Sequence, residues 1–150
     1  MWNEAYDAGI GRLTGELRQA LSSTPLKIST LTRESIPAGP GVYVIFEALE
    51  PVYVGSSGNL RRRVLYDLLK VRRHYLSIGL RDRLYGGDRA RAIDHLMKCS
   101  IAFFETETGL EAEWSERFFS SILRGKYNQW KALKKKGAPE GSTHGHIRLR

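Results

Sequence analysis

Two short runs of β-branched and aromatic residues, separated by a turn, constrain the fold of this chain more than any other feature. The first run covers residues 41–46 and reads GVYVIF, and the second covers residues 52–55 and reads VYVG. Such residues favour extended strands, and only residues 47–51 connect the two runs. The pattern therefore predicts an antiparallel β-hairpin.

Helices and one further strand are expected around this hairpin. Apolar residues at three- and four-residue steps predict an amphipathic helix over 3–21, and the three prolines of 25–40 predict a connecting loop. After the hairpin we expect a helix from about residue 60, a short helix over 88–98, a strand over 100–105 and a helix over 108–123. The last helix should bury Trp114, Phe118, Phe119 and Ile122. Residues 72–87 carry no clear pattern. The expected fold is α+β, with a small three-stranded antiparallel sheet flanked by helices and an extra N-terminal helix.

One domain is expected from a chain of 150 residues. We expect an N-terminal helix and connecting loop over 1–37, packed on a domain of residues 38–130, and a basic C-terminal tail over 131–150. Cys99 is the single cysteine, so an internal disulfide is excluded and a reducing setting is favoured. No apolar run approaches the roughly 20 residues of a membrane span, and no secretion leader is evident. These features predict a cytoplasmic protein with no membrane partner.

Positive charge is concentrated in two blocks of the chain, whose net charge is +8. Residues 59–92 hold ten Lys/Arg against three Asp/Glu, and residues 124–150 hold eight against one. Between them, residues 93–123 are acidic. Basic blocks favour a polyanion such as nucleic acid, because binding releases counterions from the phosphates. A solvated surface explains the same charges equally well, and the acidic block suits either a bound cation or a solvated helix face.

Five short motifs in a fixed order carry a resemblance to a known family. They are Gly41-Val42-Tyr43, Tyr53-Val54-Gly55, the SSGNLRRRV stretch of residues 56–64, the EAEWSE stretch of residues 111–116, and Tyr127-Asn128. Together, over about residues 39–129, they resemble the GIY-YIG nuclease family. The resemblance implies a site built from Tyr43, Tyr53, Arg63, Glu116 and Asn128.

The resemblance also implies a reaction: hydrolysis of DNA phosphodiester bonds by water, with one Mg²⁺ or Mn²⁺ ion held by Glu116. Arg63 would bind the phosphate, because its guanidinium fork matches phosphate geometry. Tyr53 would be the base, with its pKa lowered from about 10 by the guanidinium and the metal. Tyr43 would bind the water or the phosphate, and Asn128 would orient a site residue.

This chain departs from the family pattern at two points. Before Tyr127-Asn128 the family often has a proline, where this chain has Gly125 and Lys126. The family often has a histidine or a tyrosine four residues after the arginine, where this chain has Asp67. Tyr66 is the adjacent alternative. His74 and His95 lack a second histidine or cysteine at metal-ligand spacing, and we expect them to be structural or solvent-facing.

Each motif residue also has an ordinary interpretation. The tyrosines suit half-buried strand positions, Arg63 and Glu116 suit surface ion pairs, and Asn128 suits a helix cap. A second hypothesis is therefore a catalytically idle nucleic-acid-binding module with the same fold. A third is a homodimer or a partner protein docked on the N-terminal helix. DNA phosphates are expected to contact Arg61, Arg62, Arg72, Arg73, Lys134, Lys135 and Lys136.

Overall fold

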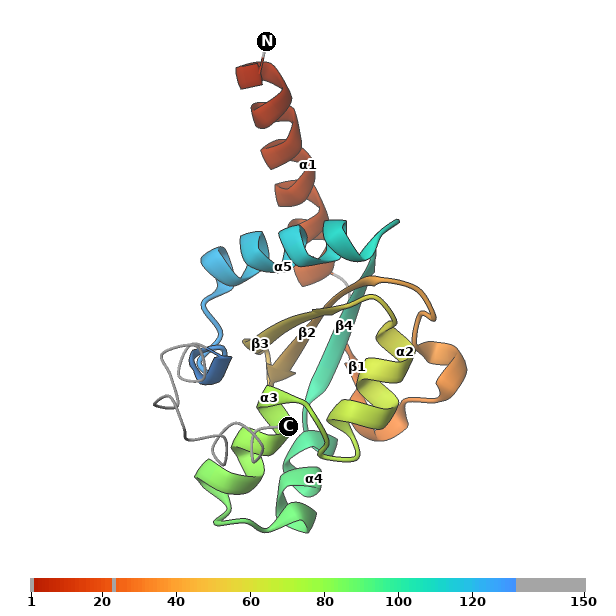
Figure 1. Cartoon of the computed structure of the whole chain (residues 1–150), viewed down its shortest axis with the longest axis vertical. Helices are drawn as coiled ribbons and strands as arrows, with labels where there is room; N and C mark the ends of the chain where they lie inside the picture. The colour runs from red at the N-terminus through yellow and green to blue at the C-terminus, as the bar shows by residue number, and fades with distance from the viewer. Residues whose placement is uncertain (1, 23, 132–150) are drawn as a thin grey trace, which may run out of the picture.

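A four-stranded antiparallel sheet forms the centre of the computed structural model, which describes residues 2–22 and 24–131. Its strands are β1 (Leu26–Lys27), β2 (Gly41–Glu47), β3 (Glu50–Ser57) and β4 (Ser100–Glu105), in the spatial order β1-β4-β2-β3 (Figure 1). The expected α+β class is confirmed, but the expected count of three strands was wrong. The additional strand β1 lies in the predicted loop, where Leu26 pairs with Ile101 and Lys27 with Ser100. Two paired residues are too few to leave an alternating pattern in a sequence.

The predicted hairpin is confirmed, with β2 and β3 joined by a tight turn at residues 48–49. This turn is shorter than predicted because β3 already begins at Glu50. Ala48 has a φ of 54°, in the left-handed region that a tight hairpin turn requires. The register shifts between Ile45 and Phe46, which bends the hairpin near its turn. Pro51 is tolerated because β3 is an edge strand.

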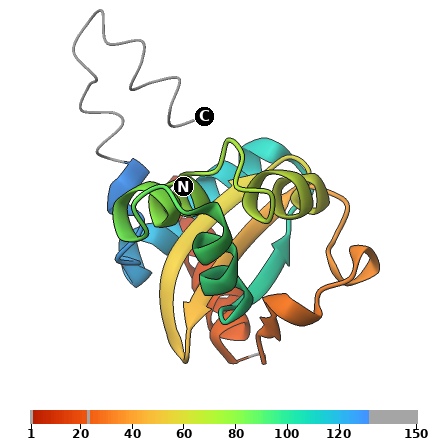
Figure 2. The same ribbon diagram turned by 90° about the horizontal axis from the view of Figure 1, so that it is seen from below.

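Helices cover both faces of the sheet, because successive side chains of β2 are buried on opposite sides. Tyr43 and Ile45 belong to one core with residues of α2 (Leu60–Arg62), the π-helical turn η3 (Arg63–Leu68), α3 (Tyr75–Gly79) and α4 (Arg89–Met97). Val42, Val44 and Phe46 belong to a second core with residues of α1 (Trp2–Ser22) and α5 (Gly109–Leu123). Figures 1 and 2 show these two sets of helices on opposite sides of the sheet.

The N-terminal helix α1 projects away from the sheet beyond α5 (Figure 1). Leu17 is buried in the second core, and Arg12 Nη1 lies 3.4 Å from Glu111 Oε1 of α5. Ile10 and Leu13, which belong to the predicted apolar stripe, stay partly exposed. Among the helices of the described residues, α1 included, none has both the length and the apolar character needed to cross a bilayer.

The connections between these elements are short helical turns and capped helix ends. Two 3₁₀ turns, η1 (Ile28–Thr30) and η2 (Arg33–Ser35), join β1 to β2. Residues 72–87 form α3 and a second π-helical turn, η4 (Leu80–Leu84), before a turn with positive φ at Gly86 and Gly87. The predicted start of α4 is confirmed, since the Asp88 carboxylate accepts the Arg91 N–H at 3.1 Å.

Helix α5 begins where it was predicted, with the Thr108 hydroxyl accepting the Glu111 N–H at 3.1 Å. Its buried face differs from the predicted one. Phe119 is fully buried, but Trp114 and Ile122 are 66% and 50% exposed. The expectation that both side chains face inward was wrong, because the helix contacts the sheet along a narrower stripe than its apolar residues cover.

Candidate active site

Tyr43 and Tyr53 lie side by side on the sheet face that packs against η3 and α3. In the hairpin register Tyr43 pairs with Gly55 and Ile45 pairs with Tyr53, so the two tyrosines are diagonal neighbours on one face. Their ring centroids are 6.2 Å apart, and each residue is only 1% exposed. A side chain at Gly55 is excluded, because a Cβ there would lie 2.3 Å from Tyr43 Cζ and Oη. The glycine of the second motif therefore makes room for the tyrosine of the first.

His74 contributes the third ring of this cluster. It precedes α3 and is fully buried, with its Nε2 atom 2.6 Å from Tyr43 Oη. The Leu76 N–H donates to Nδ1 at 3.2 Å. Because Nδ1 accepts, Nε2 carries the proton of the neutral ring and donates it to Tyr43 Oη. Burial, followed by the positive charges of Arg63 and Lys131, holds the pKa of His74 well below its usual value.

Arg63 begins the π-helical turn η3 and lies close to both tyrosines. Its Nη1 atom donates to Asp67 Oδ2 at 3.1 Å and to the Arg73 carbonyl at 2.8 Å, which fixes the guanidinium. The side chain remains 21% exposed. Asp67, four residues after Arg63, therefore orients the arginine. The ring that contacts the Tyr43 hydroxyl belongs instead to His74, the residue before α3. Tyr66, the alternative suggested by its position, is 43% exposed and packs under Lys70.

Glu116 reaches the same region from α5, together with Lys131. The Lys131 ammonium donates to Glu116 Oε1 and to the Val54 carbonyl, both at 2.7 Å. It also lies 4.6 Å from the centroid of the Tyr53 ring. Because Val54 follows Tyr53 in β3, the ion pair sits beside this tyrosine. A carboxylate and a carbonyl oxygen together hold one positive charge at the edge of the sheet.

Asn128 lies at this edge and acts on the backbone of β3. Its Oδ1 atom accepts the Val54 N–H at 3.0 Å, and its Nδ2 atom donates to the Val54 carbonyl at 2.9 Å. The Tyr127 N–H donates to the Val52 carbonyl at 3.0 Å. Gly125 permits this close approach, because a Cβ there would lie 2.5 Å from the Val52 carbonyl. The segment 125–131 is therefore attached to β3 next to Tyr53.

Burial dominates the protonation of the two tyrosines. It raises the pKa of Tyr43 to about 12, although the charge and hydrogen bonding of Arg63 act in the opposite direction. It also raises the pKa of Tyr53 well above the usual value, where the charge of Arg63 again opposes the shift. Arg63 acts in the direction expected from the sequence, but in the absence of a metal ion burial outweighs it. Both side chains are neutral phenols at neutral pH.

Three of the arginines expected to contact phosphates lie close together next to Arg63. Arg62, Arg72 and Arg73, together with Tyr66 and Asp67, line a surface cavity of about 650 Å³. Arg61 is oriented differently, since its Nε atom donates to the Ile36 carbonyl at 3.1 Å. Lys134, Lys135 and Lys136 lie outside the described residues.

All five residues selected by the motifs lie around one edge of the sheet, and the structure adds His74 and Lys131 to them. Neither addition follows from a short motif: each is brought in by a segment that packs against the hairpin from elsewhere in the chain. Comparison with known proteins finds no family model that matches the chain and no curated protein with a similar sequence. The arrangement of the site therefore carries the functional argument.

Proposed function

We propose that this protein is a metal-dependent endonuclease that hydrolyses DNA phosphodiester bonds by water attack, with a site of the GIY-YIG type. The observation that carries the proposal is the convergence of Tyr43, Tyr53, Arg63, Glu116 and Asn128 on one edge of the sheet. Ordinary strand, surface and capping roles would account for each residue singly. They give no reason for residues from a hairpin, two helices and a C-terminal turn to meet.

The donors beside Tyr43 suit the charge that phosphodiester hydrolysis develops. The partly exposed Arg63 guanidinium offers a fixed positive charge to a phosphate entering from the arginine-lined cavity. Tyr43 Oη accepts a hydrogen bond from His74 Nε2–H, so the hydrogen of the Tyr43 hydroxyl is free to be donated to another acceptor. Preorganised donors of this kind stabilise added negative charge where water has been excluded.

The contacts favour Tyr43 over Tyr53 as the base. His74 Nε2 donates to the Tyr43 hydroxyl at 2.6 Å, and the positive charge of Arg63 acts on the pKa of both tyrosines. A donor directed at this oxygen, together with the nearby positive charge of Arg63, would stabilise the phenolate, which is the form in which Tyr43 could accept a proton from the attacking water. Tyr53 would then pack beside Tyr43, with its ring facing the cation next to the Val54 carbonyl.

The oxygen atoms at Glu116 fit a divalent cation. Glu116 Oε1 and the Val54 carbonyl already hold the Lys131 ammonium, each at 2.7 Å. Mg²⁺ and Mn²⁺ accept such oxygen ligands, and Mg²⁺ usually needs only one or two carboxylates because it retains several waters. Because Lys131 contacts Glu116 Oε1, an ion bound there would compete with the ammonium for this oxygen. A bound ion would stabilise charge on the phosphoryl and leaving oxygens.

Cleavage of supercoiled plasmid tests this proposal. Purified protein is incubated with plasmid in Mg²⁺, in Mn²⁺ or in a chelator, beside Glu116→Ala and Glu113→Ala. Glu113 is an exposed carboxylate on the same helix, one turn earlier, and provides the matched control. We expect metal-dependent nicking by the wild type and by Glu113→Ala only. Equal nicking by wild type and Glu116→Ala would refute the assignment.

A second candidate function is a catalytically idle nucleic-acid-binding module. The ion pair between Lys131 and Glu116 favours this second candidate, because an ammonium held permanently at Glu116 would take the place of the metal and prevent phosphodiester hydrolysis. This candidate predicts salt-sensitive DNA binding, through Arg62, Arg72 and Arg73, with no cleavage at any metal concentration. The plasmid assay with a parallel binding measurement separates the two functions.

A further inference from the structure

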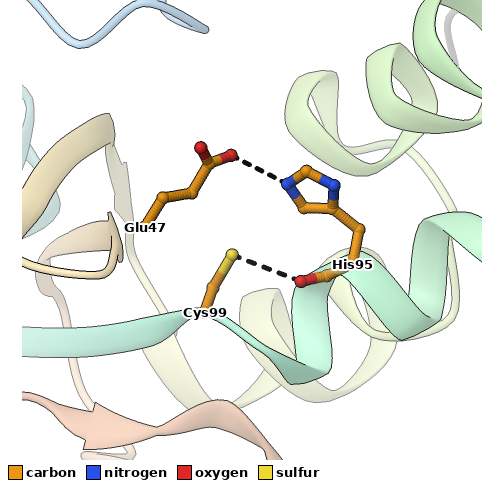
Figure 3. Close-up of side chains that lie close together, drawn as sticks. All are labelled: Glu47, His95 and Cys99. Carbon is orange, nitrogen blue, oxygen red and sulfur yellow. Dashed lines mark hydrogen bonds and ion pairs between the residues drawn. The ribbon is translucent and has the colours of Figure 1, made fainter.

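A second cluster of polar side chains lies beyond the proposed active site, at the end of β2. Glu47 is the last residue of β2, His95 belongs to α4, and Cys99 lies between α4 and β4. Figure 3 shows the three side chains directed toward one another. Cys99 follows His95 by four residues, a spacing that places both on one side of a helix end. The expectation that His95 lacks a cysteine at metal-ligand spacing was therefore wrong.

The distances in this cluster suit a single small cation. The ligand atoms of Glu47, His95 and Cys99 all lie within 4.8 Å of one another, and His95 Nε2 is 2.8 Å from Glu47 Oε1. A tetrahedral zinc ion with bonds of about 2.0 to 2.3 Å separates its ligand atoms by about 3.5 Å. Small side-chain movements would reach that separation. A cavity of about 440 Å³ borders the cluster and leaves room for a water molecule as the fourth ligand.

Neighbouring residues hold two of the three side chains in place. Tyr85 Oη lies 2.7 Å from His95 Nδ1, on the ring nitrogen that faces away from Glu47. Tyr127 Oη donates to Glu47 Oε1 at 2.6 Å, and Lys126 Nζ lies 2.8 Å from Glu47 Oε2. A metal-ligating histidine usually has such a partner on its other nitrogen, and a ligating carboxylate is usually hydrogen-bonded as well. The outer contacts of a metal site are therefore present.

We infer that Glu47, His95 and Cys99 bind one Zn²⁺ ion, with water in the fourth position. Thiolate and imidazole ligands select zinc over magnesium, which prefers oxygen atoms alone. The ion would replace the hydrogen bond between Glu47 and His95, and it would displace the proton of the Cys99 thiol into solvent. It would connect β2, α4 and the start of β4. This site is separate from Glu116 and does not depend on the nuclease proposal.

Spectroscopy with Co²⁺ in place of Zn²⁺ tests the inference on the full chain. We expect the chelator-treated protein to bind one Co²⁺ with a thiolate-to-cobalt absorption band, and Zn²⁺ to abolish that band by displacement. Because Cys99 is the single cysteine, the band can arise only from this residue. The band should disappear in Cys99→Ser, weaken in His95→Gln, and persist in Glu116→Gln, which keeps failure here distinct from failure of the nuclease proposal.

Alkylation of the wild-type protein gives a second test that needs no variant to fold. Cys99 is buried, so iodoacetamide reaches it only when the site opens locally. Zn²⁺ should slow this reaction by at least roughly tenfold, whereas Mg²⁺ should not, because a bound zinc ion would hold the site closed around the thiolate. Absence of a thiolate-to-cobalt band in the wild type would overturn the inference. Equal alkylation rates with and without Zn²⁺ would overturn it as well.

Discussion

The Lys131 ammonium occupies the position that a cation at Glu116 would take, so its removal should tighten metal binding. Lys131→Met keeps the length and apolar stem of the side chain and removes its charge. Mg²⁺ would then no longer compete with an ammonium that contacts both Glu116 and the Val54 carbonyl at 2.7 Å. We expect the variant to cleave DNA at lower Mg²⁺ concentrations than the wild type.

The size of this effect follows from the environment of the ion pair. The Lys131 and Glu116 side chains are 23% and 22% exposed, so the pair is neither freely solvated nor fully buried. Exposed ion pairs contribute about 0.2 to 1 kcal/mol, and hydrogen bonds to charged groups contribute about 1.5 to 3 kcal/mol. An intermediate value of about 1 to 1.4 kcal/mol corresponds to a roughly five- to tenfold decrease in the Mg²⁺ concentration for half-maximal cleavage.

The assay is the initial rate of plasmid nicking as a function of Mg²⁺ concentration. Lys126→Met is the matched control, because Lys126 lies in the same segment but pairs with Glu47. We expect a shifted midpoint for Lys131→Met alone, with an unchanged rate at saturating Mg²⁺. An unchanged midpoint would refute the competition, and loss of cleavage at every Mg²⁺ concentration would show that Lys131 itself supports the reaction.

Three further predictions concern the buried rings. Gly55→Ala should destabilise the protein by about 1 to 3 kcal/mol, because its Cβ collides with Tyr43; Gly58→Ala, which meets nothing within 4 Å, should be nearly neutral in urea unfolding. Equal destabilisation by Gly55→Ala and Gly58→Ala would contradict the collision with Tyr43. The pKa of buried His74 lies below its unfolded value, so the free energy of unfolding should decrease as the pH drops below about 6.5. Between pH 7.5 and 5, His74→Gln should lose less of this free energy than the wild type. The pKa of Tyr43 is raised to about 12, so stability is full below its unfolded pKa and falls as the pH rises through the folded one. Between pH 9 and 11.5 Tyr43→Phe should lose about 2 kcal/mol less than the wild type, and identical losses would argue against the raised pKa.

The elements that could be predicted are those whose signal is local. The hairpin follows from two runs of β-branched and aromatic residues around Tyr43 and Tyr53, and the starts of α4 and α5 follow from their capping residues Asp88 and Thr108. Strand β1 could not be predicted, because its two residues become a strand only by pairing with β4. Trp114 and Ile122 follow helical spacing but lie outside the stripe that meets the sheet.

The same distinction applies to the candidate site. Tyr43, Tyr53 and Arg63 could be selected because the motifs that contain them are short and continuous. His74 could not, since its contact with Tyr43 depends on how α3 packs against the hairpin. The effect of burial on the tyrosine pKa values could not be predicted either, because a motif indicates the charge of a neighbouring arginine but not the extent of burial.

Tyr43→Phe tests the central claim most directly, because it removes the buried oxygen atom that accepts the hydrogen bond from His74 Nε2. DNA cleavage in saturating Mg²⁺ and DNA binding by fluorescence anisotropy are measured on the same preparations, with Tyr66→Phe as the exposed control. A site organised around Tyr43 predicts that Tyr43→Phe loses at least about 100-fold in cleavage rate, with binding within about twofold of the wild type. Cleavage at the wild-type rate by Tyr43→Phe would contradict that organisation.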